Sequence, residues 1–266
     1  MSQVKILGIK INNLSPQEIL ERIDSFLQSK NKHYVVTPNP EFLVAATKDK
    51  KFREILNYAD LSIADGVGLT LAAKFLGQRL LRFTGADLVG YLCELAEQKN
   101  YPVFLLGGGP DIARQTAENL RLNFPQLKIT GTESGGQVDS AGRQNNTADI
   151  INKINQARPK ILFVAFGQVK QEKWIFNNLD QLNSVKVAIG VGGAFDFIAG
   201  RLKRAPKLLQ RIGLEWLYRL IQEPARYKRI FNAIIVFGWL ILKDKFLTKK
   251  NDEQISPGKR GSRYLI

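Results

Sequence analysis

The sequence has a single cysteine, Cys93, and a single histidine, His33. One cysteine excludes an intramolecular disulfide and favours a reducing compartment. One histidine excludes a metal site built from several histidines and argues against a serine–histidine–aspartate triad. Its position just before an expected strand indicates a structural role. No apolar run follows Met1-Ser2-Gln3, so we expect no signal peptide.

Basic residues are abundant, but they are concentrated at one end of the chain. The formal net charge is +15; residues 201–266 carry 16 Lys/Arg against 5 Asp/Glu, whereas residues 1–200 carry 23 against 19. This distribution argues against a nucleic-acid-binding core. It indicates a basic carboxyl-terminal appendage that faces phosphate groups or an anionic membrane surface.

Short apolar segments alternate with segments of helical periodicity over the first 200 residues. The expected strands lie at residues 4–11, 32–37, 61–64, 102–106, 127–132, 159–166 and 184–191. This alternation predicts an α/β fold with a Rossmann-like, mostly parallel sheet and helices on both faces. We expect a catalytic core at residues 1–200, a helical basic appendage at 201–248 and a disordered polar tail at 249–266.

Polar side chains stand where two of the expected strands end. Thr37 and Asn39 lie at the end of the strand at 32–37, and Asp65 follows the strand at 61–64. Ligands of an open α/β sheet bind beyond the carboxyl ends of its strands, so these residues are candidate catalytic groups, with Asp65 as the functional carboxylate. Each also has a structural interpretation. Asn39 can cap a helix that begins at Pro40, and Asp65-Gly66 can form a plain turn.

Glycines follow two other expected strands. Gly107-Gly108-Gly109 separates a strand from a helix, and Gly192-Gly193 follows the last strand, with Asp196 close behind. Backbone amides in such loops, together with a helix dipole, can hold a phosphate group. The spacing matches neither a P-loop nor a full dinucleotide fingerprint, so a tight turn is an equal alternative.

The appendage carries spaced arginines and then an apolar run. Arg219, Arg226 and Arg229 would share one face of a continuous helix, although Pro224 predicts a kink. They could bind a diphosphate or form a solvated basic face. Residues 230–242 are almost wholly apolar but fall short of the roughly 20 residues that span a bilayer. Their basic flanks suit a membrane interface; burial against the core or a dimer partner is the alternative.

Six motifs, taken together and in order, resemble the WecG/TagA/CpsF glycosyltransferases (glycosyltransferase family 26). The resemblance covers residues 4–230, and no single motif would carry it. The motifs are Thr37-Pro38-Asn39-Pro40-Glu41, Asp65-Gly66-Val67-Gly68, Gln171-Glu172-Lys173-Trp174, Gly190-Val191-Gly192-Gly193-Ala194-Phe195-Asp196, Arg204-Ala205-Pro206 and Leu214-Glu215-Trp216-Leu217-Tyr218-Arg219-Leu220.

The resemblance implies an inverting enzyme that moves an N-acetylmannosamine-type sugar from a UDP-sugar to a polyprenyl-diphosphate-linked acceptor. The reaction would serve cell-surface polysaccharide or teichoic acid synthesis, on the cytoplasmic face of the cell membrane. The implied partners are the UDP-sugar, the lipid-linked acceptor and an anionic membrane surface, with no nucleic acid; a homo-oligomer is left open. Asp65 would be the general base, with Thr37 and Asn39 beside it.

The resemblance also implies that Arg219, Arg226 and Arg229 close over the diphosphate. The other candidate substrate-binding residues are Gly107, Gly108, Gly109, Gln168, Gly193 and Asp196, although Gly107-Gly108-Gly109 is richer in glycine than the family pattern. The sequence has no convincing Asp-x-Asp metal motif, so arginines and glycine-loop amides are the available stabilisers of the leaving UDP. We therefore expect metal-independent transfer without a cofactor.

Two other functions are compatible with parts of the sequence. The glycines at residues 107–109 are also found in nucleotide-dependent oxidoreductases, but that function leaves the basic appendage unexplained. A membrane-associated UDP-binding protein without catalysis would keep nucleotide binding and would lose no function when Asp65 is replaced by asparagine.

Overall fold

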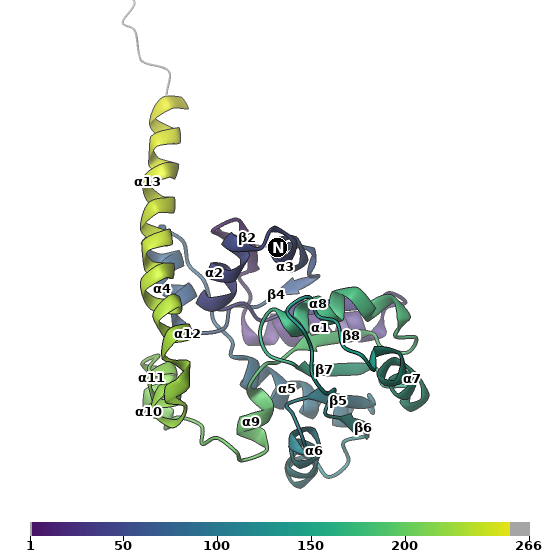
Figure 1. The fold of residues 1–266 in the computed structure, drawn as a ribbon. Coiled ribbons are helices and arrows are strands. Elements are labelled where there is room, and N and C mark those ends of the chain that lie inside the picture. Colours follow the sequence, from purple (N-terminus) through teal and green to yellow (C-terminus); the bar gives the residue numbers. More distant parts are fainter. Residues whose placement is uncertain (1, 256–266) are drawn as a thin grey trace, which may run out of the picture.

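A six-stranded parallel sheet lies at the centre of the molecule (Figure 1). The computed structural model describes residues 2–255. In spatial order the strands are β4 (Leu61–Ser62), β3 (His33–Val36), β8 (Val187–Gly190), β7 (Ile161–Ala165), β5 (Val103–Gly107) and β6 (Ile129–Glu133). Each strand is parallel to its neighbours. The predicted α/β class and parallel sheet are confirmed.

The first expected strand is instead a separate hairpin. Residues 4–11 were predicted as one strand, but β1 (Gln3–Ile6) and β2 (Ile9–Asn12) pair antiparallel with each other. Leu7 and Gly8 both have positive φ, at 49° and 82°, and form the two-residue turn between the strands. Positive φ at both central positions is typical of the tight turns that join hairpin strands, and only the glycine was visible as a signal in the sequence.

Helices cover both faces of the sheet, because its strands are buried on both sides. In β7, Ile161 and Phe163 pack into one apolar core, and Leu162 and Val164 pack into the other. One face is covered by α1 (Pro16–Gln28), α5 (Gly85–Gln98), α6 (Ile112–Asn123) and α9 (Ala194–Ile198). The other is covered by α2 (Pro40–Lys48), α3 (Lys50–Tyr58), α4 (Val67–Phe75), α7 (Thr147–Ala157), α8 (Lys170–Asn178) and the hairpin.

The carboxyl-terminal segment is helical but repeatedly broken. It comprises α10 (Lys207–Arg211), α11 (Glu215–Gln222), the 3-10 turn η2 (Pro224–Arg226), α12 (Tyr227–Phe231), the π-helical turn η3 (Asn232–Val236) and α13 (Phe237–Ile255). The break at Pro224 agrees with the expected kink. The division into a core at residues 1–200 and an appendage from residue 201 stays a prediction. The carboxyl-terminal segment packs against the rest of the molecule and shares its apolar core, so the structure does not separate the two parts.

The apolar run at 230–242 is divided between the core and the surface. Phe237 and Ile241 are buried in the same core as α2, while Ile235 and Trp239 are exposed. Helix α13 continues to Ile255, through a stretch for which we predicted disorder, and the rest of that predicted tail, residues 256–266, lies outside the described residues. Among the helices described, none has the length and apolarity that crossing a bilayer requires.

Candidate active site

A polar cavity of about 640 Å³ lies at the carboxyl ends of the strands. All the predicted site residues line it except Gly107. They are Thr37, Asn39, Asp65, Gly108, Gly109, Gln168, Gly193, Asp196, Arg219, Arg226 and Arg229. They come from the segments after five strands, β3, β4, β5, β7 and β8, and from the carboxyl-terminal helices. Parallel strands bring their carboxyl ends to one edge of the sheet, which explains why such distant residues meet.

Gly107 serves strand packing and does not reach the cavity. It is the last residue of β5 and has a φ of 109°. A Cβ atom there would lie 2.6 Å from the backbone of Ala165 on neighbouring β7, so only glycine allows this approach. Gly108, the next residue, donates its N–H to the carbonyl of Ala165 and lines the cavity.

Thr37 and Asn39 have structural contacts as well as a place in the cavity wall. Thr37 Oγ1 donates to the carbonyl oxygen of Gly190, 3.2 Å away, which ties β3 to the end of β8. Asn39 Oδ1 accepts from the N–H of Phe42 at 3.2 Å and so caps α2, as the alternative interpretation predicted. The cap fixes the side chain at the cavity wall, so the two interpretations are compatible.

Asp65 stands at the start of a turn against the amino terminus of α5. Its N–H donates to the carbonyl of Pro38 at 2.8 Å, and Gly66 takes a φ of 86°. Gly85, the first residue of α5, donates its N–H to the Asp65 carboxylate. A Cβ atom at Gly85 would lie 3.7 Å from both Asp65 Oδ2 and Thr37 Oγ1, so the start of this helix lies beside both side chains.

The surroundings of Asp65 shift its pKa into the neutral range. Burial, followed by the negative charge of Glu215, raises the pKa to about 7. The hydrogen bond from Gly85 and the positive charge of Arg82 oppose this increase. A carboxyl group with a pKa near 7 can accept a proton from a hydroxyl group and release it again at neutral pH.

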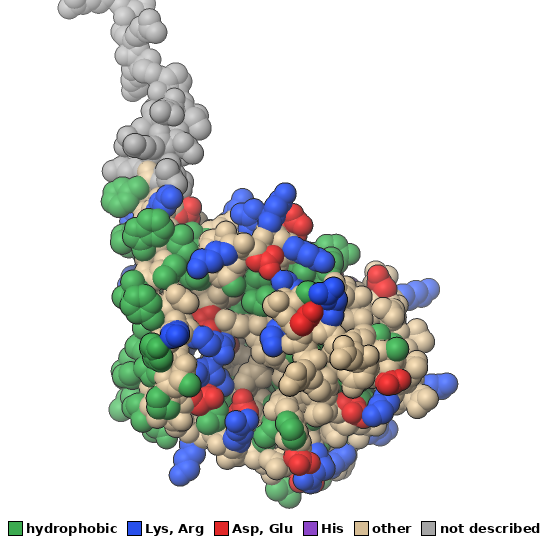
Figure 2. All heavy atoms as spheres, in the orientation of Figure 1, with side chains coloured by type: hydrophobic (Ala, Val, Ile, Leu, Met, Phe, Trp, Pro, Cys, Tyr) green, Lys and Arg blue, Asp and Glu red, His purple; other side chains and the backbone are tan. Residues whose placement is uncertain are grey.

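A second cavity of about 680 Å³ meets the first at Asp65. Its walls are mostly apolar and come from α4 and the carboxyl-terminal helices, with Leu71, Phe75 and Phe237 among the lining residues. The residues shared by both cavities are Asn39, Asp65, Val191, Gly193, Arg219 and Arg226. Figure 2 shows Lys and Arg side chains around a hollow, and hydrophobic side chains along the edge that the carboxyl-terminal helices form. Asp65 therefore separates a polar compartment from an apolar one.

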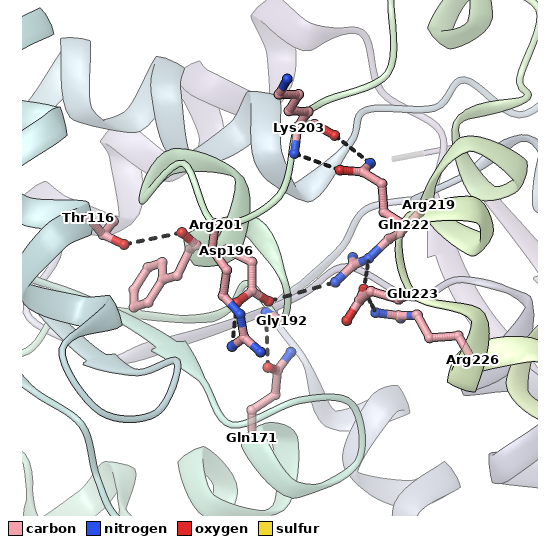
Figure 3. A network of polar contacts seen from close by, with 11 residues as sticks. Thr116, Gln171, Gly192, Asp196, Arg201, Lys203, Arg219, Gln222, Glu223 and Arg226 are labelled. Carbon is pink, nitrogen blue, oxygen red and sulfur yellow. Dashed lines mark hydrogen bonds and ion pairs between the residues drawn. The ribbon is translucent and has the colours of Figure 1, made fainter.

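Arginines line the polar cavity although the helix that carries them is broken. One oxygen of Glu223 accepts from Arg219 Nε at 2.9 Å and from Arg226 Nη1 at 3.0 Å (Figure 3). Arg219 also lies 3.7 Å from an oxygen of Asp196. Arg229 pairs with Glu41 on α2 at 2.8 Å. Burial, with the positive charges of Arg219 and Arg229, lowers the pKa of Arg226.

Comparison with known proteins agrees with this geometry. The model of the family described as "Glycosyl transferase WecG/TagA/CpsF family" matches residues 4–251. The chain belongs to this glycosyltransferase family. The predicted resemblance and the predicted enzyme class are thereby confirmed.

Similar proteins in this glycosyltransferase family include several that are named N-acetylglucosaminyldiphosphoundecaprenol N-acetyl-beta-D-mannosaminyltransferase. The one from Bacillus spizizenii (strain ATCC 23059 / NRRL B-14472 / W23) is 34% identical over 209 residues, 78% of each chain. The one from Staphylococcus aureus (strain MRSA252) is 32% identical over 252 residues, covering 94% of this chain and 96% of the relative. The one from Bacillus subtilis (strain 168) is 34% identical over 232 residues, 84% and 87% of the two chains.

Sequence reasoning assigned no role in the candidate site to several charged groups. Glu215 acts on Asp65 from the appendage, Glu223 joins two arginines, and Arg201 lines the polar cavity. Arg204, part of a quoted motif, pairs with Asp87 at 2.7 Å and with Glu215 at 3.4 Å, which fastens the appendage to the start of α5. The motif was visible in the sequence, but its pairing was not, because Asp87 lies far away along the chain and Glu215 belongs to α11.

Arg82 has a structural contact that the sequence did not indicate. Its Nη2 donates to the carbonyl of Gln210 at 2.5 Å, and it lines the apolar cavity. Among the side chains that the structure describes, at residues 2–246, no group of three or more His, Cys, Asp or Glu is arranged to hold a metal ion.

Proposed function

We propose that this glycosyltransferase transfers an N-acetylmannosamine-type sugar from a UDP-sugar to a polyprenyl-diphosphate-linked acceptor, with inversion at the anomeric carbon and without a metal. The product would enter cell-surface polysaccharide or teichoic acid synthesis. One observation carries the proposal: Asp65, with a pKa raised to about 7, lies where an arginine-lined cavity meets an apolar one. The names of the similar proteins support the sugar and the acceptor.

The donor occupies the polar cavity in this proposal. Arg219, Arg226 and Arg229 provide positive charge, and the loop at Gly108-Gly109 provides backbone amides. Guanidinium groups bind phosphate oxygens through paired hydrogen bonds and remain charged at any physiological pH. They can stabilise the negative charge that develops on UDP as it leaves, which is the task that a divalent cation performs in other sugar transfers.

The lipid-linked acceptor occupies the apolar cavity. Its walls include Leu71 and Phe75 from α4 and Ile234 and Ile241 from the carboxyl-terminal helices. Burying apolar surface of a polyprenyl chain contributes roughly 25 cal/mol per Å². An acceptor held there by its lipid would place its terminal sugar at Asp65, facing the donor.

The same helices provide a membrane-facing surface. Trp216, Ile221, Phe231, Ile235 and Trp239 are exposed apolar side chains on α11 to α13. Among them lie basic residues, including Lys228, Lys243 and Lys245. This combination is typical of helices that lie in the interface of an anionic membrane. We therefore place the enzyme peripherally on the cytoplasmic face of the cell membrane.

In the proposed reaction, the acceptor hydroxyl oxygen attacks the anomeric carbon from the face opposite UDP. The Asp65 carboxylate takes the hydroxyl proton while the bond from the anomeric carbon to the UDP oxygen breaks. The electron pair of that bond leaves with UDP, where arginines stabilise the charge. Attack opposite the leaving group inverts the configuration of the anomeric carbon.

A panel of UDP-sugars, assayed with a short-chain polyprenyl-diphosphate acceptor in the presence and absence of EDTA, tests the proposal. We expect turnover with UDP-N-acetylmannosamine, an inverted product by NMR, and equal rates with and without EDTA. Turnover that disappears with EDTA and returns with a divalent cation would overturn metal independence. Failure of every UDP-sugar on a competent acceptor would overturn the donor assignment.

A further inference from the structure

The Gln171-Glu172-Lys173-Trp174 motif lies at the start of α8 and is buried; Gln171 lines the polar cavity, and the other three residues line neither cavity. Gln171 is 1% exposed, and Glu172 is completely buried. Glu172 has two short contacts to N–H donors: its Oε1 accepts from Gln171 Nε2 at 2.6 Å, and its Oε2 accepts from the Val169 N–H at 2.7 Å. A buried acid with both oxygens engaged requires a structural or functional reason.

Gln171 connects Glu172 to the glycine turn of the donor cavity. Its Oε1 accepts from the Gly192 N–H at 3.0 Å, as Figure 3 shows. Gly190, at the end of β8, has no room for a side chain, because a Cβ atom would lie 2.5 Å from Glu172 Oε1 and 2.6 Å from Gln171 Nε2. The motif and the end of β8 therefore fit together at the cavity floor.

The polarity of this chain of hydrogen bonds is fixed by Gly192. A backbone N–H can only donate, so Gln171 must present its carbonyl oxygen to Gly192. The NH₂ group of Gln171 then faces the other way and needs an acceptor. Glu172 supplies one, and its second oxygen accepts from Val169. Burial raises the pKa of Glu172 to about 8, so both oxygens are purely acceptors once the carboxyl group is ionised above that pH.

Arg219 packs directly against the Gly192-Gly193 turn. The Arg219 guanidinium occupies the space that a side chain on Gly193 would take, and it stacks over the Phe197 ring at 4.9 Å. Gly192 has a φ of 51°, and this backbone conformation determines where Gly193 lies beneath the Arg219 guanidinium. A shift of the Gly192 N–H would therefore move the surface on which Arg219 rests.

We propose that Glu172 is a positioning residue: by accepting from Gln171 and Val169 it fixes the orientation of the Gln171 amide, which fixes the Gly192-Gly193 turn and thus Arg219 in the donor cavity. The link to donor binding rests on the proposed UDP-sugar function. The link from Glu172 to Gly192 rests only on the hydrogen bonds.

Glu172→Gln tests the proposal because a glutamine presents one oxygen and one NH₂ group. At pH 9, above the Glu172 pKa of about 8, the parent side chain is an ionised acceptor, whereas in the variant one donor, from Gln171 or from Val169, faces another donor in either orientation. We expect a displaced Gly192 amide resonance in glycine-selective ¹⁵N NMR spectra and about tenfold weaker UDP binding by calorimetry, since a buried unpaired donor has an effect of this order. An unchanged Gly192 resonance, with UDP affinity within about twofold of the parent protein, would overturn it.

Lys173→Met is the matched control for a purely structural effect. Lys173 is the next residue, is 9% exposed, and binds Asp49 at 2.6 Å and the Ser140 carbonyl at 3.0 Å, away from the glycine turn. We expect this variant to lower the melting temperature while the Gly192 resonance and the affinity for UDP stay unchanged. An equal loss of UDP affinity in both variants would assign the effect to general destabilisation.

The exchange Gln171→Glu with Glu172→Gln keeps the test decisive if the single variant does not fold. A glutamate at the first position accepts from Gly192 and from its neighbour, and a glutamine at the second accepts from Val169, so every donor again meets an acceptor. We expect the exchange to restore folding and the Gly192 resonance. Failure to restore them would overturn the proposed chain of hydrogen bonds from Glu172 through Gln171 to Gly192. If the parent protein does not bind UDP, the donor assignment fails. The Gly192 resonance still tests the chain of hydrogen bonds from Glu172 to Gly192.

Discussion

Asp65 is subject to opposing influences that come from different parts of the chain. Burial and Glu215 raise its pKa, whereas Gly85 and Arg82 lower it, and the resulting value is about 7. Its place after an apolar run identified the carboxylate in the sequence. The pKa could not be predicted in the same way, because the groups that determine it meet Asp65 only in the folded protein.

Replacing Asp65 with asparagine removes the proposed base while retaining the size of the side chain. We expect kcat to fall about a hundredfold or more, the scale of general-base catalysis, with circular dichroism unchanged. The measurement is turnover of UDP-N-acetylmannosamine on a soluble acceptor. Asp180→Asn, the same change at an exposed position, is the control and should retain full activity. Near-normal turnover of Asp65→Asn would contradict the assignment.

The raised pKa of Asp65 predicts a pH dependence whose direction follows from its role. A base acts in its deprotonated form, so kcat/KM for the donor should increase about tenfold per pH unit below about 7 and level off above it. Initial rates between pH 5 and pH 9 measure this profile. A profile that is level between pH 5 and pH 7 would show that no group with this pKa must be ionised for catalysis.

At the scale of elements, the carboxyl-terminal helices bring three arginines that are spaced along the sequence into one cavity. The spacing of Arg219, Arg226 and Arg229 predicted a common face of one helix, but α11, η2 and α12 are separate elements. The arginines still meet in the polar cavity, because Glu223 joins two of them and Glu41 holds the third. Glu223 lies at i+4 from Arg219, a pairing distance that a helix allows, whereas Glu41 was not predictable as a partner because it is far away in the sequence.

Arg219→Ala and Arg226→Ala should weaken donor binding because each removes a positive charge from the polar cavity. We expect KM for the UDP-sugar to rise about tenfold or more, the scale of a charged hydrogen bond of about 1.5–3 kcal/mol. The measurement is steady-state kinetics, with UDP affinity by calorimetry as a second reading. Arg211→Ala, an exposed arginine of α10 that lines neither cavity, should leave KM unchanged. Unchanged KM in the first two variants would show that these arginines form a solvated basic surface and do not bind the donor.

At the scale of the whole molecule, the carboxyl-terminal segment has two sides. Phe237 and Ile241 complete the core, whereas Ile235 and Trp239 face outward. Deleting the entire segment would open the core as well as remove the surface, so it cannot separate membrane binding from folding. Point changes on the outward side can.

Ile235→Glu combined with Trp239→Glu should reduce membrane binding because it places two charges on the proposed membrane face. We expect binding to vesicles that contain anionic phospholipid to fall roughly tenfold or more, since each buried apolar side chain contributes about 1.5–3 kcal/mol. Co-sedimentation measures this, and the melting temperature shows that folding is unaffected. Tyr58→Glu, at an exposed aromatic of α3, should leave vesicle binding unchanged. Equal binding of all three proteins would place the membrane contact elsewhere.

The sequence by itself determined the α/β class and the parallel direction of the strands, and it offered the cap at Asn39 as one interpretation, because periodicity, apolar runs and capping residues act over a few neighbours. The order of the strands in the sheet came only from the structure. The sequence also indicated Thr37, Asn39 and Asp65 as strand-end residues. It did not separate the hairpin at 3–12 into two strands, because the positive φ of Leu7 depends on strand pairing. The glycine run also led us to include Gly107 among the substrate-binding candidates, although this glycine allows the close approach of β5 to β7.

The tertiary structure alone decided the division into a polar and an apolar cavity, the pKa of Asp65, and the chain of contacts from Glu172 to Arg219. Each depends on groups that are separated by tens to hundreds of residues and that meet at one edge of the sheet. Hydrogen bonds and charges act over a few ångströms in space, so the order of residues along the chain does not reveal them.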